Sequence, residues 1–171
     1  MKLRCPNIKR GNLKMSSLID VAIKRLSERQ TSEHELRSYL QTEFADLSDL
    51  DTRIESVFKR LKELQLINDS RLATNLAQHY AHKGNRFITQ MLRQKGIRED
   101  VILNVLLSLD NENVRALDEA RKKFDRHWDS SEKAITLLHR FLSGRSFSNT
   151  AITTVIGQLG KQKTYTTPEH I

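Results

Sequence analysis

Two stretches of the chain repeat each other at an offset of fifty residues. The stretch 91–106, MLRQKGIREDVILNVL, matches 141–156, FLSGRSFSNTAITTVI, at most of its apolar positions and at one cation. The matched pairs are Leu92 with Leu142, Lys95 with Arg145, Ile97 with Phe147, Ile102 with Ile152, Val105 with Val155 and Leu106 with Ile156. A period of this size is typical of tandem units that stack to bury their apolar faces. The repeat therefore predicts an elongated, curved array.

Apolar residues recur three and four positions apart along almost the whole chain, which is the spacing of one helix face. With only 6 Gly and 2 Pro in 171 residues, few positions interrupt such helices, and a strand-rich fold is disfavoured. We therefore predict an all-α fold of about nine helices. The expected core residues include Leu18, Ile54, Leu72, Ile88, Ile102, Val114, Leu117, Ala120, Phe124, Leu138 and Ile152.

Local signals mark where these helices begin and end. Ser32 and Glu35 have the spacing of a capping box, and Ser48 with Asp51 repeats this start signal. Gly96 is expected to end a helix in a left-handed conformation, and Gly160 to end the last one.

The predicted helices fall into three groups of three, each ending with a short helix, a tight turn and a final helix. This grouping gives three-helix repeats at 16–66, 67–110 and 111–160. The first repeat carries a looser version of the turn, with Phe44 in it and a longer connection to the next helix. The ends of the chain, a basic arm at 1–15 and a tail at 161–171, show no apolar stripe and are expected to be flexible.

The net charge of +8 favours a polyanionic partner, nucleic acid first, although such a charge also suits a merely soluble protein. No apolar run approaches the length of a membrane span, and the N-terminus lacks the apolar core of a signal peptide. The single cysteine, Cys5, cannot form an internal disulfide. We therefore expect a cytoplasmic protein that does not contact membranes. A monomer is expected because no heptad pattern is sustained.

Catalytic signals are weak. The chain has no glycine-rich phosphate loop, no G-x-S-x-G and no H-E-x-x-H. His79 and His82 have a spacing that two metal ligands could use, but no cysteine or acid is placed to complete a site, so two exposed polar residues are the favoured interpretation. Asp49 and Asp51 are interpreted as acids at a helix start. We predict no enzymatic activity, no metal and no cofactor.

Two basic clusters are the candidate binding residues. The first brackets the short helix of the second repeat, and the second surrounds Phe124 and Trp128 in ARKKFDRHW. Phe124 is expected to point into the core, whereas Trp128 could either pack or stack on a base. The clusters could contact phosphates or acidic protein, or form only a solvated face. The candidate residues are Lys83, Arg86, Arg93, Lys95, Arg98, Arg121, Lys122, Lys123, Arg126 and Arg145.

Recurrence of a cation at one turn position, Lys95 and Arg145, favours a binding role, since an exposed position there has no packing reason to keep a cation. A helix-turn-helix reader of DNA sequence is disfavoured. The stretches that would read bases, EDVILNVLLSL and NTAITTVIGQL, are apolar and lack the Arg, Asn and Gln that recognise base edges.

Four stretches in order resemble one known family. AIKRLSERQTSEHELRSYL (22–40) is similar to the family's opening, with Leu26, Arg29, Ser32, Glu35 and Leu36 at its spacing. LINDSRLATNL (66–76) resembles the junction between its first two repeats, and 88–97 and 141–152 resemble its later turns. The resemblance is to the RecX family of recombinase regulators and covers about 18–159. The family's turn has a glycine, which this chain replaces in Thr42-Glu43-Phe44 and in Arg145-Ser146-Phe147, and the loop at 84–87 is shorter than the family's.

The resemblance implies a regulator with no enzymatic activity of its own. Such proteins bind the RecA recombinase filament on single-stranded DNA and inhibit strand exchange, ATP hydrolysis and co-protease activity. They also bind DNA, both single-stranded and double-stranded DNA being candidate partners here. The alternative from the residues alone is a nucleic-acid-binding helical repeat protein without a recombinase partner.

Overall fold

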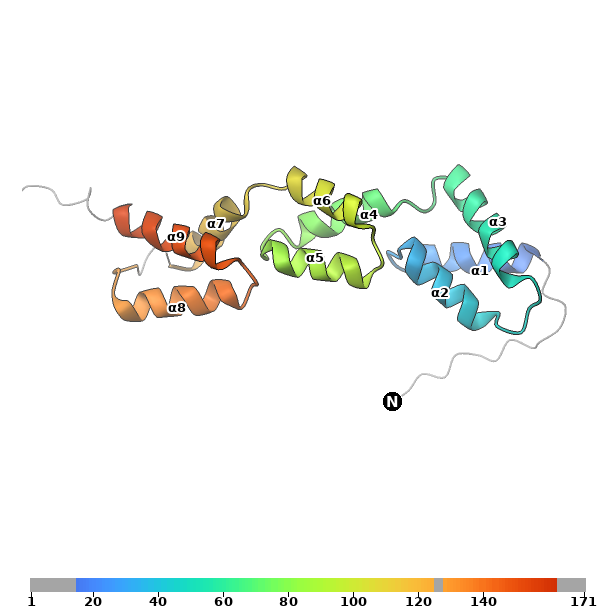
Figure 1. Cartoon of the computed structure of the whole chain (residues 1–171), viewed down its shortest axis with the longest axis horizontal. Coiled ribbons are helices and arrows are strands. Elements are labelled where there is room, and N and C mark those ends of the chain that lie inside the picture. The colour runs from blue at the N-terminus through green and yellow to red at the C-terminus, as the bar shows by residue number, and fades with distance from the viewer. Residues whose placement is uncertain (1–14, 125–127, 163–171) are drawn as a thin grey trace, which may run out of the picture. The chain divides into compact units, whose positions relative to one another are not determined.

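The computed structural model describes residues 15–124 and 128–162, and within them every regular element is a helix (Figure 1). The predicted all-α fold is therefore confirmed. Nine helices lie in the described part, and two compact units divide between Asp69 and Ser70. The predicted arm, apart from Met15, and all of the tail beyond Gln162 lie outside the described residues, as does Arg126.

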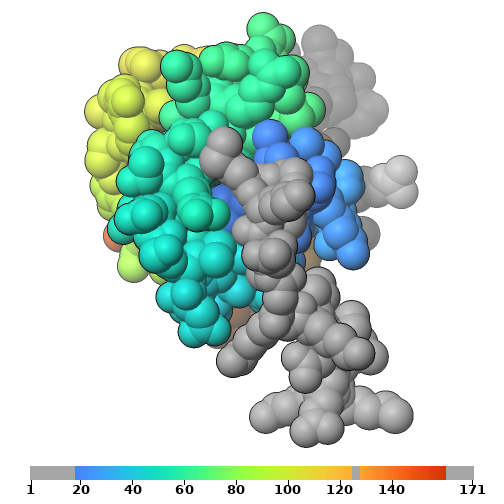
Figure 2. All heavy atoms as spheres, turned by 90° about the vertical axis from the view of Figure 1, so that its right-hand side faces the viewer, coloured from blue at the N-terminus to red at the C-terminus, as the bar shows by residue number. Residues whose placement is uncertain are grey.

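The first unit holds α1 (Met15–Glu28), α2 (Glu33–Glu43) and α3 (Leu50–Glu63), with the α2–α3 connection and α3 drawn in teal in Figure 2. Its buried residues form one cluster, which includes Leu18, Leu36, Ile54 and Phe58. The capping box predicted at the start of α2 is present. The Ser32 side chain accepts from the Glu35 amide, and the Glu35 side chain accepts from the Ser32 amide, each over 3.1 Å.

The connection from α2 to α3 differs from the predicted start signal. The residue before α3 is Asp49, which has a left-handed backbone (φ 57°) and makes no side-chain cap. The capping role expected of Ser48 and Asp51 is therefore wrong. The longer connection is confirmed, and Phe44 is buried within it.

The second unit contains two separate apolar clusters. One belongs to α4 (Asp69–His79), α5 (Asn85–Gln94) and α6 (Glu99–Ser108), and the other to α7 (Glu112–Phe124), α8 (Glu132–Ser143) and α9 (Asn149–Gln162). The matched apolar positions of the repeat divide between them, Leu92, Ile97 and Ile102 in the first and Leu142, Phe147 and Ile152 in the second. The expectation that these residues stack one repeat on the next is wrong, because each three-helix group buries them internally.

The repeated turn has the same backbone in both groups. Gly96 (φ 71°) and Ser146 (φ 62°) both lie in the left-handed region, as a helix stop requires. The next amide then reaches back to the helix, from Ile97 to the Leu92 carbonyl (3.1 Å) and from Phe147 to the Leu142 carbonyl (3.2 Å). Serine thus adopts the glycine-like conformation where the sequence lacks glycine.

Two details of the later helices differ from expectation. Helix α9 continues to Gln162, so Gly160 does not end it. In α7, Val114 is half-exposed at 50%, whereas Arg115 and Glu119 are buried beside Ala116 and Ala120. The buried face of α7 is therefore rotated by one residue from the predicted stripe, and it carries two charged side chains into the interior.

Candidate functional site

A run of residues without acids covers α4, α5 and the turn that follows. Residues 70–98 contain no Asp or Glu, but six Lys or Arg and two His. Charge summed over the whole predicted repeat hides this run, because Asp69, Glu99, Asp100 and Asp110 lie just outside it. The sequence signal that would have found this run is the length of the segment without Asp or Glu.

The exposed side of α5 is the centre of this run. Arg86, Thr89, Gln90, Arg93 and Gln94 line an open hollow of about 610 Å³ on that helix. Arg86 is exposed, and among the residues that the structure describes none forms a hydrogen bond or ion pair with its guanidinium. An unpaired exposed guanidinium is available to a carboxylate or phosphate group of a partner.

Two of the predicted cations are already paired with acids that follow the run. Arg93 donates to both carboxylate oxygens of Glu99, over 2.6 and 3.0 Å, and Arg98 donates to both oxygens of Asp100. These hydrogen bonds lower the pKa of Glu99 and of Asp100 and raise the pKa of both arginines. All four side chains are exposed, so solvent screens each pair and an external anion can compete for it.

The remaining cations of this cluster have other surroundings. Lys83 is half-buried, and its Nζ lies 5.5 Å from the centre of the Phe87 ring. Lys95 is also half-buried and has a partner within the chain. Of the five cations predicted around α5, Arg86 is thus the one that is exposed and has no hydrogen bond or ion pair with another described residue.

The loop before α5 is held from the other three-helix group. Buried Arg115, only 6% exposed, donates to the carbonyl oxygens of Ala81 (2.8 Å) and Lys83 (2.6 Å) and to the Asn85 side chain. Its Nε donates to the Asp110 carbonyl. Burial lowers the pKa of Arg115, and the nearby Glu112 and Asp110 carboxylates oppose that shift.

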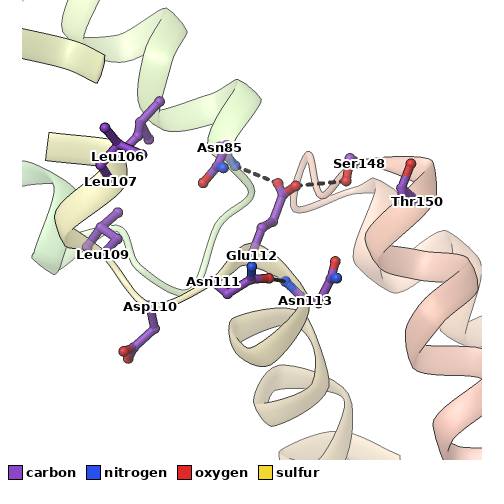
Figure 3. Close-up of a pocket in the computed structure, with 10 residues that line it drawn as sticks. All are labelled: Asn85, Leu106, Leu107, Leu109, Asp110, Asn111, Glu112, Asn113, Ser148 and Thr150. Carbon is purple, nitrogen blue, oxygen red and sulfur yellow. Dashed lines mark hydrogen bonds between the residues drawn. The ribbon is translucent and has the colours of Figure 1, made fainter. Parts of the chain in front are cut away.

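Glu112 completes this junction. One carboxylate oxygen accepts from the amide of Asn85 and the other from the hydroxyl of Ser148, each over 2.7 Å (Figure 3). The starts of α5 and α9 are thus tied to a single side chain on α7. These contacts lie beside a hollow of about 490 Å³, which Leu106, Leu107 and Asp110 also line.

The described part of the second basic cluster lies on α7, and most of its members there, like Arg145 on the α8–α9 turn, have intramolecular partners. Lys122 donates to Glu119 over 2.6 Å. Arg145 lies 3.9 Å from the centre of the Phe141 ring and 3.5 Å from the Glu119 carboxylate. The expectation that packing gives no reason for a cation at Arg145 is wrong, because this residue covers an aromatic ring and neutralises a buried acid.

The other members of the second cluster divide between packing and exposure. The Lys123 Nζ lies 4.7 Å from the Phe141 ring centre, whereas Arg121 is exposed. Phe124 packs against the core as predicted, and Trp128 is buried in it, which resolves the choice between packing and stacking in favour of packing.

Among residues 15–124 and 128–162, no three His, Cys, Asp or Glu side chains gather as a metal site. None of the helices in that part of the chain has the length and apolarity to cross a bilayer.

The described residues form an all-helical fold built from three-helix groups, and comparison with known proteins gives its relatives. The chain is 34% identical over 112 residues to the regulatory protein RecX of Streptococcus pneumoniae, and 30% identical over 122 residues to that of Listeria welshimeri. These matches cover 62% and 68% of this chain but 42% and 44% of the relatives, so it spans less than half of their length. In sequence, the chain is similar to the RecX family of regulatory proteins.

Solved structures agree at the level of the fold. RecX from Lactobacillus salivarius superposes with a TM-score of 0.70 at 23% identity, covering 86% of this chain and 97% of that one. A second RecX crystal structure gives a TM-score of 0.60 at 23% identity, covering 86% and 81%. A search against family sequence models finds no match.

Proposed function

We propose that this chain binds the RecA filament assembled on single-stranded DNA and inhibits its strand exchange, ATP hydrolysis and co-protease activity. In this proposal it acts in the cytoplasm as a monomer of three helical repeats, with no catalysis of its own. The relatives are named regulatory proteins, which supports a regulatory rather than an enzymatic role.

The acid-free run at 70–98 is the observation that carries this proposal. A run of six cations without an acid in the sequence is suited to DNA phosphates and to acidic patches on a protein filament. Arg86 is presented directly, and Arg93 and Arg98 become available if a partner anion replaces their exposed acids. We therefore place the main contact with the filament on α5 and the loop before it.

The second basic cluster has a smaller role in this proposal. Arg121 and Lys122 are exposed and can add to the attraction of a polyanion, but Lys122, Lys123 and Arg145 are also needed inside their own group. Arg126 lies outside the described residues and stays a sequence-based candidate.

The experiment is ATP hydrolysis by RecA on single-stranded DNA, with and without this chain at amounts well below those that saturate the DNA. The proposal predicts inhibition at these substoichiometric amounts, because the chain acts on the filament. The alternative, a nucleic-acid-binding protein without a recombinase partner, predicts inhibition only when the chain covers the DNA. Either result is read against binding of the chain to bare DNA at the same salt concentration.

A further inference from the structure

Four aromatic rings gather on the nine-residue stretch HYAHKGNRF (79–87), at the end of α4 and the start of α5. Tyr80 is the central ring. Its centre lies 4.7 Å from that of His79, edge to face, 5.4 Å from that of Phe87 and 6.1 Å from that of His82. The two histidines are exposed and the other two rings are half-buried. The cluster therefore has two half-buried rings, Tyr80 and Phe87, and two exposed rings, His79 and His82.

Two cations lie on the same stretch. Lys83 lies over Phe87, and Arg86 projects from the first turn of α5 without a partner among the described residues. The stretch itself contains no acid. The Glu112 carboxylate contacts its main chain, at the Asn85 amide. Aromatic faces beside cations are a combination that binds single-stranded nucleic acid, since bases stack on the rings while phosphates meet the cations.

The backbone of this stretch is fixed before any ligand arrives. Arg115 holds the carbonyls of Ala81 and Lys83, and the Gly84 amide donates to the Arg145 carbonyl over 2.8 Å. All of these bonds engage main-chain atoms and leave the side chains of His82 and Arg86 exposed. A platform ordered in advance loses little conformational freedom when it binds.

We propose that residues 79–87 form a stacking platform for the bases of single-stranded nucleic acid, with His79 and His82 as the stacking rings and Lys83 and Arg86 as the phosphate contacts. This inference rests on the proposed function, because it assigns to residues 79–87 the part of the filament contact that binds the single-stranded DNA. An acidic protein segment is the competing ligand, but it would use the cations and not the rings.

The test measures fluorescence anisotropy of a labelled single-stranded oligonucleotide of about 16 thymidines with the full chain. The double variant His79→Ala/His82→Ala removes the exposed rings. We expect its affinity to fall about fivefold or more. The matched control is His139→Ala, an exposed histidine on α8, for which no change is expected. Circular dichroism checks that both variants fold.

Two further arms separate stacking from charge. An oligonucleotide of the same length with abasic sites should bind more weakly than thymidines and should not distinguish the double variant from the wild type. The variant His79→Phe/His82→Phe keeps the rings and should restore binding to thymidines. Arg86→Ala should instead lower the slope of log affinity against log salt by about 0.7, the value for one phosphate contact on a single strand.

Equal affinity of the folded His79→Ala/His82→Ala variant and the wild type for thymidines would overturn the platform. The platform would also be overturned if the His79→Ala/His82→Ala variant lost affinity for poly-glutamate but not for thymidines. These outcomes leave the proposed function intact if the wild type still inhibits RecA at substoichiometric amounts. Conversely, ring-dependent binding to thymidines without any effect on RecA supports the platform and contradicts the proposed function.

Discussion

The amide of Gly84 donates a hydrogen bond to the carbonyl of Arg145 over 2.8 Å, which brings the loop before α5 against the turn before α9. A Cβ atom at position 84 would lie 2.0 Å from the Ser146 carbonyl oxygen, closer than any real contact of that kind. The two backbones can approach only because residue 84 has no side chain. The loop that carries Lys83 and leads into Arg86 is thus shaped by Arg145, 61 positions after Gly84 in the chain.

Gly84→Ala should destabilise the chain by about 1–3 kcal/mol, because the main chains must separate to admit the methyl group. Urea unfolding followed by circular dichroism measures this change. The matched control is Gly157→Ala on α9, where no described atom other than the neighbouring residues and the helix's own backbone lies within 4 Å of the added carbon. It should stabilise the helix by about 0.5–1 kcal/mol. Equal effects of the two substitutions would contradict the close approach.

Arg115→Leu should cost roughly 3 kcal/mol of stability, since it leaves the half-buried carbonyl oxygens of Ala81 and Lys83 without their charged donor. Arg115→Lys should recover only part of this loss, because one ammonium group cannot span the same set of acceptors. Thermal unfolding of both variants checks the order. A leucine variant as stable as the wild type would show that the junction does not hold the loop.

Ser146→Gly should stabilise the chain by about 1 kcal/mol, because serine is strained at a φ of 62° and glycine is not. Gly96→Ala, at the equivalent turn with a φ of 71°, should destabilise it by about 1–2 kcal/mol. The melting temperatures of the two variants should therefore move in opposite directions. Movement in the same direction would mean that the two turns are not equivalent.

Glu99→Gln with Asp100→Asn should strengthen binding to single-stranded DNA by about twofold to tenfold at low salt, since it frees Arg93 and Arg98 for phosphates. Both acids have a lowered pKa in the folded chain, so their pairs are complete at neutral pH and are lost only as the pH falls through those values. Anisotropy at pH 7 gives the affinities. Unchanged binding would indicate that these arginines do not face the DNA.

Lys122→Glu should lower the melting temperature, because it places a second carboxylate beside buried Glu119. Arg121→Glu changes charge equally on the same helix and should leave the melting temperature unchanged, since Arg121 is exposed. A double variant with Lys122 and Lys123 changed to Glu would therefore alter stability as well as binding. Arg121→Glu alters binding without altering stability. Equal melting temperatures of Lys122→Glu and Arg121→Glu would contradict the structural role of Lys122.

The helices could be predicted because their signals are local. Apolar spacing, the Ser32–Glu35 capping box and the left-handed Gly96 each depend on a few neighbouring residues. The junction could not be predicted in this way. Arg115 and Glu119 look like surface residues in sequence. Arg115 is buried against carbonyl groups about thirty positions earlier in the chain, and Glu119 is buried beside Arg145.

The candidate site was predicted in part. The basic residues around α5 were recognised from composition, but their pairing with Glu99 and Asp100 and the isolation of Arg86 depend on side-chain geometry that no spacing rule gives. The recurrence of Lys95 and Arg145 suggested a binding role, whereas Arg145 packs on Phe141. The cation therefore occurs in both repeats at a position where at least one of the two residues, Arg145, stabilises the fold.

The most direct test of the central claim compares Lys83→Glu/Arg86→Glu with Lys133→Glu in the RecA assay. Lys133 is an exposed cation on α8, outside the acid-free run. Each protein is added to RecA and single-stranded DNA, and the amount that halves ATP hydrolysis is measured. We predict that the double variant needs at least about ten times more protein, as expected when two phosphate or carboxylate contacts are reversed, and that Lys133→Glu behaves as the wild type. Equal inhibition by all three folded proteins would contradict a contact through α5 and the loop before it.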